Sequence, residues 1–245
     1  MKKILSFCLL SFFLLSLLTS PGYSQKASDI LDKMIDAQGG KKVLGSIKDT
    51  TISGSLEMIA VGASGSVTIY HKEPNKVRMD MEMMGMVITV AFDGETAWMI
   101  NPQTGSTEEM SGKDAEDMKR DVYDFGYSAL LYPEKYSITY AYKGKEKIEG
   151  KDYFVLEQIF SDGHKKTLYI DSKTYLTFKI KDITLNDSGV EVEEEEFRSD
   201  YKKVDGVMFP HSITSFEDGG EAAKVTVTNV KFNTGLENSL FEMSK

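Results

Sequence analysis

Cysteine is almost absent from this chain: the single one, Cys8, lies in an apolar stretch close to the N-terminus. That stretch follows two lysines, runs from Ile4 to Leu18, and is followed by small residues up to Ser24. A basic start, an apolar segment and a small-residue end are the pattern of a secretory signal peptide. We therefore predict a leader at residues 1–24 and a mature domain at residues 25–245, which no disulfide bond can stabilise.

A lipid-modified N-terminus is not expected either. Cys8 comes early in the apolar stretch and follows Phe7. The cysteine of a lipoprotein instead follows a small residue at the end of such a stretch. We therefore expect an exported protein that is soluble once its leader is removed.

Basic residues are also scarce, with 29 Lys and Arg against 38 Asp and Glu and a formal net charge of −9. Phosphate binding needs clustered Lys and Arg, so nucleic acid is not expected as a partner. No stretch after the leader is long and apolar enough to span a bilayer. The mature protein is therefore not expected to be integral to a membrane.

Local motifs for catalysis and cofactor binding are missing: there is no phosphate-binding loop, dinucleotide fingerprint, zinc-protease motif or nucleophile elbow. His71, His164 and His211 are far apart in the sequence, at predicted strand ends or turns, which favours surface or edge positions. A Ser-His-Asp set assembled in space keeps a hydrolase open as an alternative. We predict no catalytic residue, no metal and no cofactor.

The acidic run Glu191–Glu196 has two interpretations. Clustered carboxylates attract cations. A solvated strand face or a protected sheet edge explains the same residues without a ligand, and we favour this second interpretation.

The most regular part of the chain runs from Val77 to Phe92. Met79, Met81 and Met83 alternate with polar residues, which is the period-two pattern of a half-buried strand. Met84-Gly85 can turn the chain into a second strand, and Asp93-Gly94 is a strong hairpin signal. With two-residue turns, the methionine face continues to Met99, and Trp98 lies on the opposite face.

Five methionines between Met79 and Met86 are unusual for a strand, because Met has only a modest β preference. A methionine-filled core is one interpretation. A soft wall that fits several apolar shapes is the other, and it predicts a lipid-sized cavity. The candidate lining residues are Met79, Met81, Met83, Met86, Ile88, Val90, Phe92 and Met99.

Helical spacing predicts an amphipathic helix over Ser28–Leu44, capped by Ser28 or Asp29 and interrupted at Gly39-Gly40. One or two helices are predicted between Gly105 and Tyr132. Strands are predicted at Thr50–Ile59, Ser66–His71, Val77–Met83, Met86–Phe92, Thr96–Asn101, Ser137–Lys143, Tyr153–Phe160, Lys166–Asp171, Leu176–Leu185, Val190–Arg198, Val207–Phe216 and Lys224–Phe232. The spacing predicts a mainly β (α+β) fold with one large antiparallel sheet, curled or barrel-like.

Three parts of the chain resemble known groups of proteins. The region Lys72–Pro102 resembles the LolA/LolB-like family of periplasmic lipoprotein carriers. Gly39-Gly40 and the late segment Tyr201–Pro210 look like the broader group of outer-membrane lipoprotein-sorting proteins. The residues of the first motif are Pro74, Arg78, Asp93, Gly94, Trp98 and Pro102.

This resemblance implies an unclosed antiparallel β-barrel whose helices cover a hydrophobic cavity. It also implies a periplasmic, non-enzymatic carrier whose partners are acyl chains of lipids or lipoproteins, together with envelope transport or receptor proteins. An envelope lipid or lipoprotein sensor on the same fold is the alternative. In the related shuttles an Arg just before the motif proline latches the lid, whereas this chain has Glu73 there.

Overall fold

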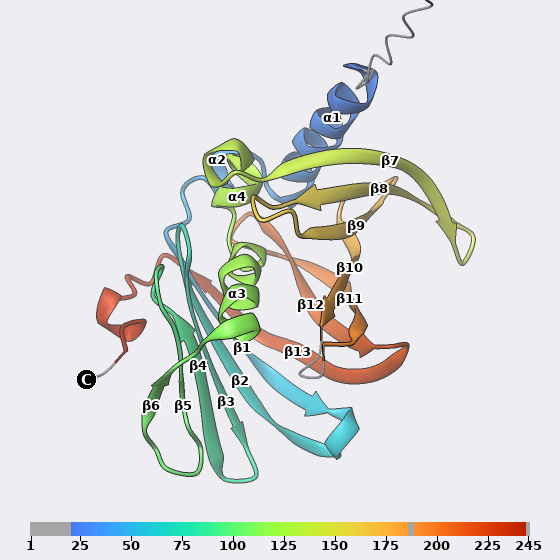
Figure 1. Ribbon diagram of the computed structural model, residues 1–245. Coiled ribbons are helices and arrows are strands. Elements are labelled where there is room, and N and C mark those ends of the chain that lie inside the picture. Colours follow the sequence, from blue (N-terminus) through green and yellow to red (C-terminus); the bar gives the residue numbers. More distant parts are fainter. Residues whose placement is uncertain (1–20, 186–188, 244–245) are drawn as a thin grey trace, which may run out of the picture.

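A single curled sheet organises the structure, a computed structural model that describes residues 21–185 and 189–243. The sheet is antiparallel and has 13 strands in the order β6-β5-β4-β3-β2-β1-β13-β12-β11-β10-β9-β8-β7. It does not close, because β6 and β7 are its two edges (Figure 1). The strands are β1 Asp49–Met58, β2 Ala63–Lys72, β3 Lys76–Met83, β4 Met86–Phe92, β5 Ala97–Ile100, β6 Thr107–Glu109, β7 Thr139–Ile148, β8 Lys151–Ile159, β9 Lys165–Asp171, β10 Thr177–Leu185, β11 Glu191–Val204, β12 Val207–Glu217 and β13 Gly220–Phe232. The predicted mainly β fold with an unclosed curved sheet is confirmed.

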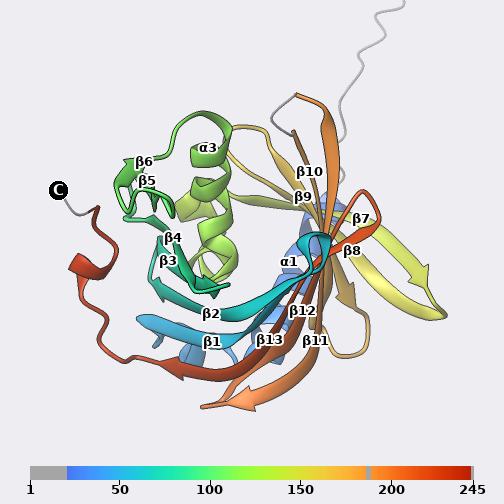
Figure 2. The ribbon, with the colours of Figure 1, turned by 90° about the horizontal axis from the view of Figure 1, so that it is seen from below.

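Helices cover the concave face of the sheet in two groups. The N-terminal helix α1 packs its apolar side on β7, β8 and β9, and α3 lies inside the curl of β1–β5 (Figure 2). The helices are α1 Pro21–Gln38, α2 Lys41–Leu44, α3 Gly112–Asp121 and α4 Ser128–Leu131, with 3-10 turns η1 Ile59–Val61, η2 Val122–Asp124, η3 Pro133–Tyr136 and η4 Asn238–Leu240. The helices predicted between Gly105 and Tyr132 are therefore present as α3, η2 and α4.

The start of the first helix differs from the prediction. Helix α1 begins at Pro21 and runs through Ser28 and Asp29, so the predicted cap at these residues is wrong. A proline in the first turn is favourable because its missing N–H has no partner there anyway. The predicted leader lies outside the described residues as far as residue 20, and its cleavage stays a prediction.

The predicted break at Gly39-Gly40 is confirmed, and it has a packing reason. Gly39 has a φ of +139°, and a Cβ there would lie 2.7 Å from the carbonyl oxygen of Gly206 in the β11–β12 turn. Only glycine allows this approach. The break thus fixes α1 against the sheet.

The register of β3, β4 and β5 confirms the predicted faces. Met83 pairs with Met86, Met79 with Val90, and Val90 with Met99, so these side chains share the concave face. Trp98 lies on the convex face.

Four strand predictions fell short, one of them at β7, which continues five residues beyond the predicted end at Lys143. Strand β6 was missed because it has only three residues. Strand β11 continues six residues beyond the predicted end at Arg198, and β13 begins at Gly220 rather than Lys224. Polar residues in these extensions hide the strand signal, because the period-two pattern needs a contrast between the two faces.

The C-terminal segment, residues 233–243, crosses the convex face of β1–β5 and was not predicted. Asp49 accepts hydrogen bonds from the backbone N–H groups of Thr234 and Gly235 at 2.6 and 3.0 Å. Trp98 Nε1 donates to the carbonyl of Phe241 at 2.7 Å, and the Phe241 side chain is fully buried. We call residues 233–243 the C-terminal strap.

Candidate ligand-binding cavity

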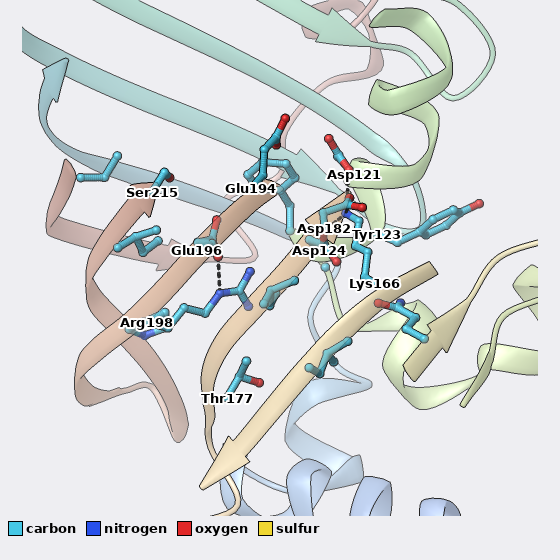
Figure 3. Close-up of a pocket in the computed structure, with 18 of the residues that line it drawn as sticks. Asp121, Tyr123, Asp124, Lys166, Thr177, Asp182, Glu194, Glu196, Arg198 and Ser215 are labelled. Carbon is cyan, nitrogen blue, oxygen red and sulfur yellow. Dashed lines mark hydrogen bonds and ion pairs between the residues drawn. The ribbon is translucent and has the colours of Figure 1, made fainter. Parts of the chain in front are cut away.

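A cavity of about 700 Å³ lies on the concave side of the sheet, between α1, the α3–α4 segment and strands β8–β13 (Figure 3). Side chains from both halves of the curled sheet reach it, together with residues of α1 and α4. Its apolar wall includes Met34, Ile52, Ile69, Met79, Leu130, Leu168, Ile180, Met208, Phe209, Ile213, Val225 and Val227.

One end of the cavity is polar. Cross-strand pairing aligns Gln158, Lys166, Asp182, Glu194 and Glu217 in a single row across β8–β12, and all five line the cavity. The row lies close to the hairpin tips of these strands. We call it the polar rim; its three carboxylates outnumber its one ammonium group.

We call the segment from α3 to α4, residues 112–131, the helical cover. Lys166 ties this cover to the rim. Its side chain is 5% exposed, and Nζ donates to Asp121 Oδ1 and Asp124 Oδ2, each at 2.6 Å. Burial opposes its charge, but the attraction of Asp124 and Asp121 outweighs burial and raises the pKa of Lys166. The ammonium group therefore stays charged and fastens α3 and η2 to β9.

Glu73 fastens the other side of the cover. Its carboxylate accepts hydrogen bonds from the backbone N–H groups of Tyr127 at 2.6 Å and Ser128 at 3.2 Å, at the start of α4. Carboxylates are favoured at a helix start, where the N–H groups lack partners within the helix. Glu73, directly before Pro74, thus holds the cover through hydrogen bonds to its backbone.

His71 lies beneath this contact and is fully buried. Neither ring nitrogen has a hydrogen-bond partner among the described residues. Burial lowers the pKa of His71 to about 4. A Cβ on Gly126 would lie 2.3 Å from His71 Cε1, so the cover approaches β2 here closely enough to need glycine.

Arg198 on β11 reaches into the interior of the cavity (Figure 3). Its Nε donates to Glu196 Oε1 at 2.5 Å. Nearby, the Tyr201 hydroxyl donates to the carbonyl of Thr177 at 2.6 Å. Burial, more than the opposing field of Arg198, raises the pKa of Tyr201 to about 12. These polar groups lie away from the rim, among apolar lining residues.

The acidic run does not lie at a sheet edge, but part of it is solvated as predicted, since Glu191 and Glu194 are exposed. Strand β11 lies between β10 and β12, and Glu194 and Glu196 face the cavity. On the convex face, Glu195 pairs with Lys179 at 2.6 Å, and Glu193 pairs with Lys181. The sequence did not reveal this, because charged residues on both faces of β11 remove the contrast that marks an inner face.

Of the eight predicted lining residues, the structure places Met79 at this cavity. Met81 and Met83 lie on the same concave face but belong to the apolar cluster that also contains Met118 and Val122 of the helical cover. Met86 is 50% exposed at the hairpin. A ligand contact for Met81, Met83, Met86, Ile88, Val90, Phe92 and Met99 stays a prediction.

The motif residues are placed in turns and on the convex face. Pro74, Asp93, Gly94 and Pro102 are in turns, and Asn75 Nδ2 donates to the Gly94 carbonyl at 3.3 Å, which links two of these turns. Arg78 and Trp98 bind the C-terminal strap. None of the six lines the cavity.

The histidines do not form a catalytic set with a hydroxyl group in the described part of the chain. His164 Nε2 lies 2.7 Å from Asp182 Oδ1, but no Ser, Thr or Tyr hydroxyl bonds the imidazole there. Within residues 21–185 and 189–243, no three His, Asp or Glu side chains are arranged to hold a metal. No helix in these ranges is both long and apolar enough to cross a bilayer.

Comparisons with known proteins agree with the architecture. Residues 67–245 match the model of a family described as "-like: Uncharacterized protein". No curated protein sequence gives a significant match.

Three solved structures share the fold. A LolA superfamily protein from Nitrosomonas europaea aligns with a TM-score of 0.60 at 14% identity, over 88% of this chain and 97% of that chain. A DUF1329 family protein from Desulfovibrio piger gives 0.58 at 16% identity, over 88% and 97%. A domain assigned to outer-membrane lipoprotein sorting, from Vibrio parahaemolyticus, gives 0.57 at 17% identity, over 89% and 97%. At these identities the likeness establishes the fold.

Proposed function

Because this chain belongs to the family that its residues 67–245 match and has the LolA superfamily fold, we propose that it is an exported, periplasmic carrier. In this proposal it binds acyl chains of lipids or lipoproteins in its cavity and catalyses no reaction. The observation that carries the proposal is a largely apolar cavity of about 700 Å³ under a helical cover. Pockets for small molecules typically measure roughly 300–1,000 Å³.

The energetics of an acyl chain suit a carrier, which must also release its cargo. A chain of about 15 methylenes contributes roughly 12 kcal/mol when it is buried. Association and ordering oppose this by roughly 4–15 kcal/mol. Net binding is therefore weak enough for transfer to a receptor protein or membrane.

Lipid analysis of the protein isolated from its own host tests the proposal directly. We expect co-purified acyl lipid or acylated protein in about equimolar amount. A preparation free of lipid, which also fails to bind a fluorescently labelled fatty acid, would overturn the carrier assignment.

A second test of the carrier proposal compares a substitution that fills the cavity with the same substitution on the opposite face of the strand. Ile180 lines the cavity, whereas Ile183, on the opposite face of the same strand, is 43% exposed. We expect Ile180→Trp to lower the affinity for the labelled fatty acid by about tenfold, through lost volume and lost apolar contact. Ile183→Trp should bind as the unmodified protein does.

A further inference from the structure

The guanidinium of Arg198 is a charged group deep in a mainly apolar cavity. Protein surrounds the residue closely, and the 21% of its side chain that is exposed faces the cavity. Burial opposes the charge, but the attraction of Glu196, together with the fields of Tyr201 and Asp124, outweighs it, and the pKa of Arg198 lies above its usual value. The cavity therefore contains a permanent cation.

Most hydrogen-bond donors of this cation are free. A guanidinium carries five N–H donors in a planar fork. In residues 21–185 and 189–243, Arg198 has one hydrogen-bond partner, Glu196, which accepts from Nε. The N–H groups on the two terminal nitrogens have no protein acceptor in that range. Because they form the edge of the fork that binds carboxylates and phosphates in pairs, they can receive an anion without displacing Glu196.

The charge distribution along the cavity sets the orientation of a ligand. At the polar rim, Asp182, Glu194 and Glu217 repel an anion, and Lys166 is already bound by Asp121 and Asp124. Arg198 lies four residues from Glu194 along β11, which is about 13 Å at roughly 3.3 Å per residue. An anionic head group is therefore favoured at Arg198 and disfavoured at the rim.

We propose that the cavity selects single-chain amphiphiles with an anionic oxygen head group, a carboxylate or a phosphate monoester, bound by the terminal N–H groups of Arg198. This inference rests on the proposed function and adds the class of ligand. The head group lies near Thr177 and Tyr201, and the tail follows the apolar wall of Leu168, Ile180 and Ile213. Glu196 holds the guanidinium in position and also competes with the ligand through its charge.

The test compares palmitate, hexadecyl phosphate and the neutral hexadecanol as competitors of a fluorescent fatty acid, on mature protein freed of lipid. We expect the two anions to bind more tightly than the alcohol. Arg198→Met should weaken palmitate binding by at least about tenfold, as loss of charge-assisted hydrogen bonds predicts, and leave hexadecanol binding nearly unchanged. Arg198→Lys should fall between the two.

Glu196→Gln tests the head-group assignment even if Arg198→Met does not fold, because this variant keeps the Arg198 cation and removes the competing negative charge of Glu196. We expect it to tighten binding of palmitate several-fold and to leave hexadecanol unaffected. Lys179→Met, which breaks the ion pair between Lys179 of β10 and Glu195 of β11 on the convex face, is the control and should change neither affinity.

The outcomes separate the two proposals. If wild-type protein binds hexadecanol as tightly as palmitate, and neither Arg198→Met nor Glu196→Gln changes their ratio, the head-group assignment is wrong and the carrier proposal stands. If the wild-type protein binds none of the three, the carrier proposal fails. The tighter of the two anions identifies the head group as carboxylate or phosphate.

Discussion

Single side chains hydrogen-bond the backbone in opposite senses on the two sides of the sheet: they donate on the convex face and accept at the edge of the concave side. On the convex face, Arg78 and Trp98 donate to carbonyl groups of the C-terminal strap. At the edge of the concave side, Glu73 accepts from N–H groups of the helical cover. Backbone groups outside regular structure need such partners when they are buried, so residue identity at these positions is set by hydrogen bonding.

His71 makes stability depend on pH. Its folded pKa of about 4 lies below the ordinary value of 6.5, so the unfolded chain binds the proton more readily. The stability from neutral His71 is complete above pH 6.5 and is lost as pH falls toward 4. The largest loss is about 3 kcal/mol.

Urea unfolding of the wild type and His71→Leu across this interval checks the prediction. Titrating groups that both proteins share contribute equally and cancel in the comparison. The free energy of unfolding of His71→Leu should therefore depend less steeply on pH than that of the wild type. Parallel curves would mean that His71 is not held neutral in the folded protein.

At the scale of elements, polar contacts attach the helical cover on both sides, through Glu73 on the β1–β5 side and through Lys166 and the Arg120–Asp162 ion pair on the β8–β9 side. The sequence at the start of α4 contains no helix-capping signal that would predict the contact with Glu73. We expect Glu73→Ala to destabilise the protein by about 1–3 kcal/mol, because two N–H groups lose a charged acceptor. Hydrogen exchange at the amides of Tyr127 and Ser128 should become faster.

Glu134→Ala is the control for this change. Glu134 is exposed, and its side chain has no hydrogen-bond partner among the residues that the structure describes. It should leave both measurements unchanged. Equal effects of the two substitutions would show that Glu73 acts only through overall charge.

The C-terminal strap is a second element whose stability depends on one side chain. Phe241 is fully buried, and its carbonyl accepts from Trp98. We expect Phe241→Ala to lower the free energy of unfolding by about 3–5 kcal/mol through lost burial and a new cavity. Ser239→Ala, at an exposed strap position, should change it little. A small effect of Phe241→Ala in thermal melting would indicate that the strap detaches in solution.

At the scale of the whole molecule, the predicted leader overlaps the first turn of α1. In the part of this helix whose side chains are described, from Lys26 on, the buried residues are Ala27, Ile30, Met34 and Ile35, all beyond the predicted cleavage after Ser24. We therefore expect the mature protein to begin at or near Gln25 and to keep its fold. N-terminal sequencing and thermal melting of protein lacking residues 1–24 check this. An intact leader on the exported protein, or a large drop in melting temperature, would contradict it.

The sequence by itself determined the strands with contrasting faces and the turns between them. Alternation at Met79–Met83 and the Met84-Gly85 and Asp93-Gly94 turns specified register, because a slip of one residue would expose the apolar face. Gly39-Gly40 likewise marked the helix break. These signals are local: each depends on neighbours within a few positions.

Only the tertiary structure decided where the cavity lies and which charges enter it. The methionine face is mostly covered by α3, and the open space falls beside β11, where charged residues on both faces leave no pattern to read. Lys166 and Asp121, like Arg78 and the strap, meet across long sequence separations. The role of a charged residue at the cavity depends on which partner it meets in the folded protein and on whether water remains beside it, and neither is visible in the local sequence.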